Sequence, residues 1–184
     1  MVALEYFPEM NGLVLAAGGQ PNEGLGIAAF FDLAKQAWRL LARELPMGGH
    51  STFIEYNPVR KVVIFGGGSG SDSTSFHTLN GDGRISRMKK AAVSLGINSS
   101  CVTVDPVGGK YLVLHESNRF YEYDVEADAW TKLPGPVHLF SAGPATYSTI
   151  EASITTYGVN MFVYYNREDS KVWLYKHSAG PAGK

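Results

Sequence analysis

The segment EYNPVRKVVIFGG, at residues 55–67, decides how the chain folds. A short extended run ends at Pro58, and a run of apolar residues follows and ends at Gly66 and Gly67. Proline favours turns, whereas Val, Ile and Phe favour strands, so the segment predicts a β-hairpin. Its second strand is apolar on both faces, which is typical of a strand whose sheet has packed neighbours on both sides.

Three further segments repeat this pattern. They are EYFPEMNGLVLAAGG at 5–19, TVDPVGGKYLVLH at 103–115 and, more loosely, TTYGVNMFVYY at 155–165. Pro8, Pro58 and Pro106 are separated by 50 and 48 residues. A period of this length indicates repeated β-units that stack on one another.

A second signature follows the hairpins. An aromatic residue and then Asp32 or Asp124 end a third strand, and Trp38 or Trp130 opens a fourth strand six residues later. The second repeat keeps a turn sequence, NGDG from Asn80, but lacks the Trp. We predict that Trp38 and Trp130 occupy equivalent positions and are buried between adjacent sheets.

These residues resemble the kelch repeat of the kelch and galactose-oxidase-like propellers. In that repeat a Gly-Gly pair ends the second strand, a Tyr-Asp type pair ends the third, and a Trp opens the fourth. Gly18, Gly19, Gly66 and Gly67 match the Gly-Gly positions and are predicted to be structural. The resemblance implies an all-β fold, a kelch-type β-propeller or partial propeller of about four antiparallel four-stranded blades.

The predicted organisation is one domain over residues 1–176 and a flexible tail over 177–184. The blades are expected at about 2–46, 47–95, 96–136 and 137–176, the last without a fourth strand.

The incomplete last blade leads to an expectation about assembly. An unpaired strand at 171–176 leaves backbone groups open for pairing, so we expect two chains to meet through their terminal blades as a homodimer. A closed four-bladed ring and a piece of a longer chain are the alternatives.

Composition narrows the possible partners. The chain has 184 residues, with 16 Lys+Arg against 17 Asp+Glu, so neither nucleic acid nor an anionic membrane is an expected partner. The first residues lack the pattern of a signal peptide, and no apolar run approaches the ~20 residues that span a bilayer. The expected location is cytoplasmic. Cys101 is the one cysteine, so no internal disulfide forms, and we expect an inert thiol.

Several motifs suggest chemistry but lack essential parts. GGGSGS at 66–71 has neither the Lys nor the helix of a phosphate-binding loop. NGDGRI at 80–85 resembles part of a calcium loop, but Lys89 stands where the bidentate Glu belongs. A copper site of the galactose oxidase kind needs a Cys cross-linked to a Tyr, which Cys101 in an ordinary strand does not suggest. We therefore predict no metal, no cofactor and no catalytic residue.

The loops at one mouth of a propeller are the expected binding site, because ligands bind in such concave openings. The residues predicted there are Gln20, Asn22, His50, Ser69, Asp72, Asn98, Glu116 and Asn118. The predicted function is a non-enzymatic binding module that recognises a protein segment or a glycan. The alternative is a carbohydrate-active enzyme on a propeller scaffold, which opposed carboxylates or a metal held by His50 and His115 would favour.

Overall fold

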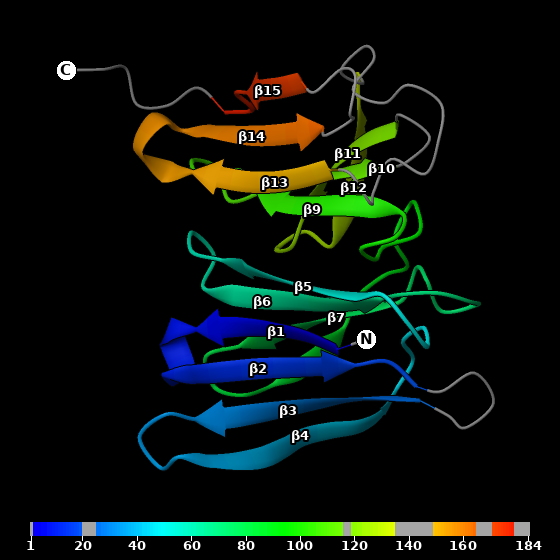
Figure 1. Ribbon diagram of the computed structural model, residues 1–184, viewed down its shortest axis with the longest axis vertical. Helices are drawn as coiled ribbons and strands as arrows, with labels where there is room; N and C mark the ends of the chain where they lie inside the picture. Colours follow the sequence, from blue (N-terminus) through cyan, green and yellow to red (C-terminus); the bar gives the residue numbers. More distant parts are fainter. Residues whose placement is uncertain (1, 20–24, 116–118, 135–148, 165–170, 179–184) are drawn as a thin grey trace. The chain divides into compact units, whose positions relative to one another are not determined.

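In the computed structural model the chain is built from antiparallel β-sheets (Figure 1). The structure describes residues 2–19, 25–115, 119–134, 149–164 and 171–178. The chain divides into two compact units, residues 1–97 and 98–184. Each unit is described by itself.

The first unit contains two four-stranded sheets whose strands follow one another in chain order. The first sheet consists of β1 (Val2–Phe7), β2 (Gly12–Ala17), β3 (Gly26–Asp32) and β4 (Ala37–Leu45), with the short 3-10 helix η1 (Pro8–Met10) between β1 and β2. The second sheet consists of β5 (Thr52–Asn57), β6 (Val62–Gly67), β7 (Phe76–Asn80) and β8 (Ile85–Arg87).

The second unit repeats this arrangement. The third sheet consists of β9 (Ser100–Val104), β10 (Tyr111–His115), β11 (Arg119–Asp124) and β12 (Ala129–Leu133). The fourth sheet consists of β13 (Thr149–Ile154), β14 (Val159–Tyr164) and β15 (Lys171–Tyr175), with the 3-10 helix η3 (Thr155–Tyr157) between β13 and β14.

The predicted all-β class and the antiparallel, propeller-like sheets are confirmed. Each sheet lies within one of the four predicted blade segments, and the fourth sheet has three strands among the described residues. The assignment to the kelch type and the single domain over residues 1–176 stay predictions. The described part of the chain contains no helix with the length and apolar character that a membrane crossing requires.

Acidic or amide side chains hold the hairpin turns, which explains why they recur in the sequence. The Oδ1 atom of Asp32 accepts hydrogen bonds from the backbone N–H groups of Ala34 and Lys35, both at 3.0 Å. Asp124 caps the β11–β12 turn in the same way. Asn57 holds the turn after β5. Such side chains replace backbone partners in tight turns.

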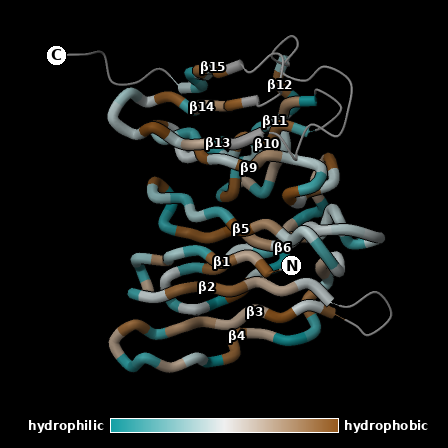
Figure 2. Tube along the Cα trace, in the orientation of Figure 1, coloured by the Kyte–Doolittle hydropathy of each residue, from teal (hydrophilic) through white to brown (hydrophobic). Residues whose placement is uncertain are grey.

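The strand register of the first sheet places apolar residues in rows across all four strands. Directly opposed residues point to the same face, and successive residues alternate between faces. We call one side the outer face of the first sheet. Its two full rows are Tyr6, Leu13, Phe31, Trp38 and Leu4, Leu15, Ala29, Leu40, which are joined by Val2, Ala17 and Ile27. Hydrophobic stretches run along β2 and β3 in Figure 2.

The opposite, inner face of the first sheet packs against the second sheet. Its contribution to the shared core includes Phe7, Val14 and Phe30, and that of the second sheet includes Val63 and Phe65. All five side chains are buried. The packing of these two faces holds the first unit together, because burial of apolar surface is the main stabilising contribution in folding.

The second unit has an equivalent core between the third and fourth sheets. Leu112, Leu114 and Phe120 of the third sheet are buried with Phe162 of the fourth sheet, and Trp173 packs against them. The rings of Phe120 and Phe162 lie 6.2 Å apart at 88°, a favourable edge-to-face geometry.

The predicted equivalence of Trp38 and Trp130 is confirmed, but the prediction that Trp38 is buried is wrong. Trp38 opposes Phe31 as Trp130 opposes Tyr123, so the two positions are equivalent. Trp130 is partly buried, with its ring 4.7 Å from that of Tyr123. Trp38 is 53% exposed, because it lies on the outer face of the first sheet, which no sheet of the first unit covers.

His77 on β7 is a polar residue inside the first unit. It is 2% exposed, and its ring stacks on Phe65 at 5.5 Å between centroids. Its Nδ1 atom has no hydrogen-bond partner. Burial, and then the charge of Arg87, lower the pKa of His77 from 6.5 to about 4.

We predict that His77 makes the chain sensitive to acid. Between about pH 6.5 and pH 4 the unfolded chain binds a proton at this histidine and the folded chain does not. The free energy of unfolding should therefore fall as the pH falls through this window, by on the order of 3 kcal/mol. His77→Phe should flatten this part of the curve, as measured by urea unfolding at a series of pH values. An equally steep fall in the variant contradicts the assignment.

Candidate functional site

Three chain segments meet at one end of the second sheet. We call this region the loop end, made up of residues 46–51, 68–75 and 88–97. Backbone hydrogen bonds tie the segments to one another and to β6. Gly48 N donates to Gly67 O at 2.7 Å, and Gly68 N donates to Leu95 O at 2.7 Å. Ile97 N donates to Ser51 O at 3.1 Å.

Two of the predicted site residues, His50 and Ser69, lie together at the loop end. The backbone N–H of His50 donates to Ser69 Oγ at 3.2 Å, and the backbone N–H of Ser69 donates to His50 O at 2.8 Å. Both residues are exposed. The pair links the β4–β5 loop to the β6–β7 loop and leaves the imidazole of His50 at the surface.

The other predicted site residues have different outcomes. Asp72 is partly buried, and its Oδ1 accepts a hydrogen bond from Ser75 Oγ at 3.3 Å, so it stabilises its own loop. Asn98 opens the second unit, so its place beside His50 stays a prediction. The remaining predicted residues, Gln20, Asn22, Glu116 and Asn118, lie outside the described residues.

The glycines explain how the loops approach so closely. Gly67 has a φ of 60°, and a Cβ at this position would lie 2.2 Å from Leu95 O. A Cβ at Gly18 would lie 1.7 Å from Gly48 O. Only glycine gives the space that these backbones need. These close approaches are consistent with the structural roles predicted for Gly18 and Gly67, which stay predictions.

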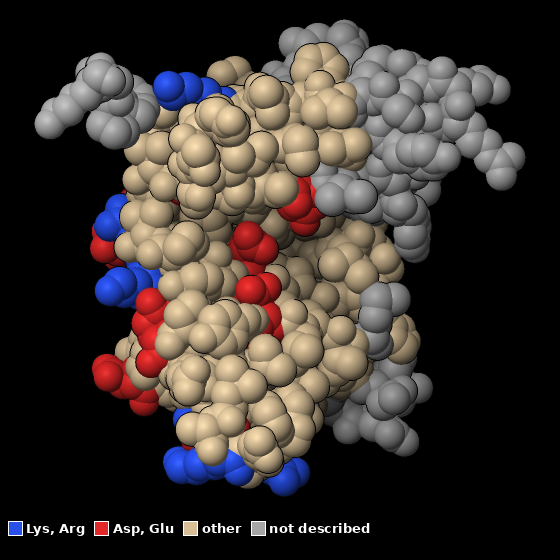
Figure 3. Space-filling view, turned by 60° about the vertical axis from the view of Figure 1, so that its left-hand side comes forward, with Lys and Arg blue, Asp and Glu red and all other residues tan. Residues whose placement is uncertain are grey.

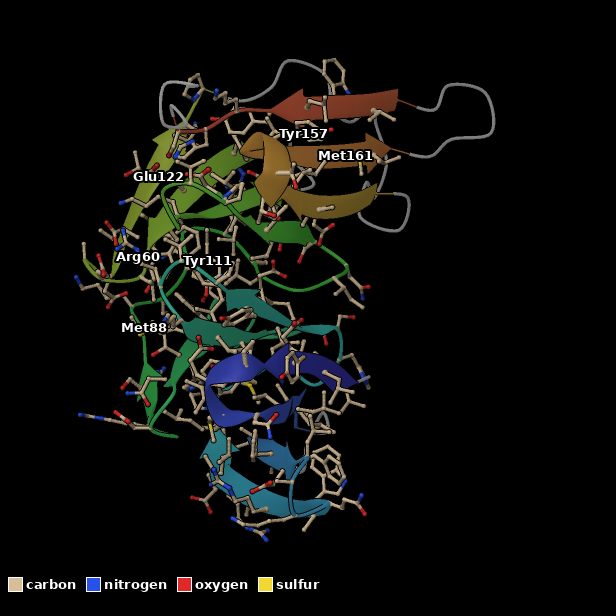
Figure 4. The ribbon with its side chains drawn as sticks, turned by 90° about the vertical axis from the view of Figure 1, so that its left-hand side faces the viewer. Arg60, Met88, Tyr111, Glu122, Tyr157 and Met161 are labelled. Atoms are coloured by element: carbon tan, nitrogen blue, oxygen red, sulfur yellow. The ribbon has the colours of Figure 1, made fainter. Side chains whose placement is uncertain are left out.

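The second unit contains a polar array that sequence reasoning missed. His177 Nε2 lies 2.7 Å from Glu122 Oε2, and His177 Nδ1 lies 3.1 Å from the hydroxyl of Tyr175. Figure 4 shows Glu122 on β11. Burial, and then the charges of Glu122 and Asp105, raise the pKa of Tyr175, so its hydroxyl keeps its proton. The array is suited to joining residue 177 to the third sheet.

Asp105 holds the adjacent residue in the same way. Its carboxylate is fully buried and accepts hydrogen bonds from Gly108 N at 2.8 Å and from Ser178 Oγ at 2.5 Å. His177 and Ser178, which the sequence assigns to a flexible tail, therefore both bond to the third sheet and its hairpin. No local motif in the sequence could indicate the contact between Glu122 and His177, because the two residues are 55 positions apart.

The cysteine is not poised for reaction. Cys101 is buried on β9, and burial, followed by the nearby Glu151 carboxyl, raises the pKa of its thiol. A protonated, buried thiol is a poor nucleophile.

In the described ranges, no group of three or more His, Cys, Asp or Glu side chains is arranged to hold a metal ion. Figure 3 presents a largely uncharged surface with small, separate groups of acidic and basic side chains.

Comparison with known proteins relates the chain to others by fold. No protein-family model and no curated protein matches it. It is similar to the solved structure of a fungal alcohol oxidase of the AA5 family in complex with copper, with a TM-score of 0.62 and 16% sequence identity. The match covers 93% of this chain and 40% of that chain.

A second similar structure is a protein of unknown function from Bacteroides thetaiotaomicron, with a TM-score of 0.47 and 10% identity over 89% of this chain and 41% of that chain. The chain thus spans about two fifths of the length of both structures. At these identities the likeness to the alcohol oxidase concerns the fold alone.

We predict that alanine is tolerated much less at Gly67 than at Gly70. Both glycines have a positive φ, 60° at Gly67 and 91° at Gly70, so the backbone strain of a side chain is not lower at Gly70 than at Gly67. A Cβ at Gly67 meets Leu95 O, whereas a Cβ at Gly70 meets nothing within 4 Å. Gly67→Ala should lower the free energy of unfolding by at least ~2 kcal/mol more than Gly70→Ala in chemical denaturation. Equal losses would show that the loops do not approach as described.

Proposed function

We propose that the chain is a non-enzymatic binding module that recognises a protein segment or a glycan through the loop end. The observation that carries this proposal is the pair formed by His50 and Ser69. It supports an exposed imidazole on a backbone that is bonded to neighbouring segments. Groups held in place before binding lose little conformational entropy when a ligand arrives, so they favour recognition.

The chemistry of this surface suits a neutral polar ligand. An imidazole both donates and accepts hydrogen bonds, so the exposed His50 side chain can pair with peptide amides and with sugar hydroxyls. The balance of 16 Lys+Arg against 17 Asp+Glu gives no reason to expect a highly charged partner.

A carbohydrate-active enzyme is the second candidate, and the likeness in fold to an AA5 alcohol oxidase favours it. That protein is in complex with copper. The described residues of this chain give no support to a copper centre, since no three or more of their His, Cys, Asp and Glu side chains are arranged to hold a metal ion and the Cys101 thiol is buried and protonated. The binding module is therefore the better-supported proposal.

The proposal is tested by screening the purified chain against an oligosaccharide array and a peptide library. The affinity for a ligand found in this way is then measured for the wild-type chain and for two variants. His50→Ala should weaken binding at least about fivefold, because it removes a central polar contact. Asp82→Ala, an exposed change in the β7–β8 turn at the other end of the second sheet, should leave the affinity unchanged.

Two results would overturn the proposal. One is a ligand whose affinity depends on Asp82 and not on His50. The other is copper-dependent oxidation of a sugar alcohol to the aldehyde by the purified chain, with O2 reduced to hydrogen peroxide, which would establish the enzyme instead.

A further inference from the structure

The outer face of the first sheet combines apolar character with exposure. Its rows contain no charged residue across four strands. Leu4 and Trp38 are each 53% exposed, and Tyr6 and Leu40 are also exposed. Contiguous apolar surface of this kind marks a contact site in a protein.

The second sheet shows what such a face packs against. One row of the second sheet lies in the same place in the repeat as the row from Tyr6 to Trp38 in the first sheet, one residue before the turns. This row consists of Tyr56, Val63, Leu79 and Ile85. In the second sheet this row is covered by the inner face of the preceding sheet, and Val63 and Leu79 are fully buried. The first sheet presents the same kind of face with no preceding sheet in its unit.

The fourth sheet has the complementary feature. Its inner face, with Phe162 and Trp173, packs against the third sheet. The register places Ala152, Met161 and Leu174 in one row of the opposite face, and Val163 and Val172 in the next. Figure 4 labels Met161 on β14. We call this side the outer face of the fourth sheet.

The five residues named on this second face are uncharged, and two of them are exposed. Val172 is 63% exposed and Leu174 is 67% exposed. In the first unit, the inner face of the first sheet packs against one face of the second sheet. In the second unit, one face of the third sheet packs in the same way against the inner face of the fourth sheet. The outer face of the fourth sheet corresponds to the face that the first and third sheets use in this packing. The outer face of the first sheet corresponds to the face that the second and fourth sheets use.

We propose that two copies of the chain associate through these faces. The outer face of the fourth sheet of one copy packs against the outer face of the first sheet of the other, which repeats the pairing found inside each unit. The rows named on both surfaces are apolar and uncharged, which lowers the cost of removing them from water. Each copy carries one face of each kind, and a dimer that uses both contacts leaves neither face exposed.

Sedimentation and light scattering on the full chain test this proposal. The wild-type chain should change with concentration from a species of 20.0 kDa to a dimer of twice that mass. Leu40→Lys and Leu174→Lys should each raise the dissociation constant at least about tenfold, because each introduces a charge into an apolar contact. Circular dichroism checks that the variants fold, and Leu4→Lys is a second variant on the first sheet.

Matched control variants lie away from both faces. Val59 in the β5–β6 turn is 40% exposed, close to the 43% of Leu40, and Tyr157 in η3 is 75% exposed, close to the 67% of Leu174. Val59→Lys and Tyr157→Lys should associate like the wild-type chain. Equal loss of association in the controls would overturn the proposal.

A mixing experiment tests which faces meet. Leu40→Lys and Leu174→Lys chains, mixed in equal amounts, should form a mixed dimer, because one of the two contacts then has both partners unchanged. A mixture that stays monomeric contradicts the proposed pairing. If the Leu174→Lys chain by itself dimerises like the wild-type chain, the first sheets of the two copies meet each other instead. A wild-type chain that stays at 20.0 kDa at all concentrations excludes self-association.

Discussion

The packing of one apolar sheet face against another is the interaction on which both units depend. Each described core lies between two sheets, in the first unit around Val14, Phe30 and Phe65, and in the second around Leu114 and Phe162. Strands with apolar residues on both sides need a neighbour on each face of their sheet. The first and fourth sheets each have an apolar face that no described sheet of their own unit covers.

The same arrangement positions the segments of the loop end. The sheets fix the ends of β4, β6 and β8, and the glycines allow the connecting segments to come within hydrogen-bonding distance. The loops then hold one another through their backbones, and we propose that the exposed side chain of His50 is used for recognition. Binding residues are often carried by loops on a rigid scaffold in this way.

The features that were predictable from the sequence are local ones. Asp32 and Asp124 cap turns through bonds to residues two and three positions ahead, so the hairpins and the register of Trp38 and Trp130 could be read from short motifs. The exposure of Trp38 could not, because burial depends on whether another sheet covers that face. The bridge from Glu122 to His177 was equally hidden, because it joins residues far apart in the chain.

The most direct test of this account is the accessibility of Trp38 in a chain in which Trp130 and Trp173 are replaced by phenylalanine. Acrylamide should quench the fluorescence of Trp38 readily in dilute solution, as expected for a ring that is 53% exposed on an uncovered face. Quenching should become weaker as the chain is concentrated and the face is covered. A Trp38 that is shielded from acrylamide even in the dilute monomer would contradict the account.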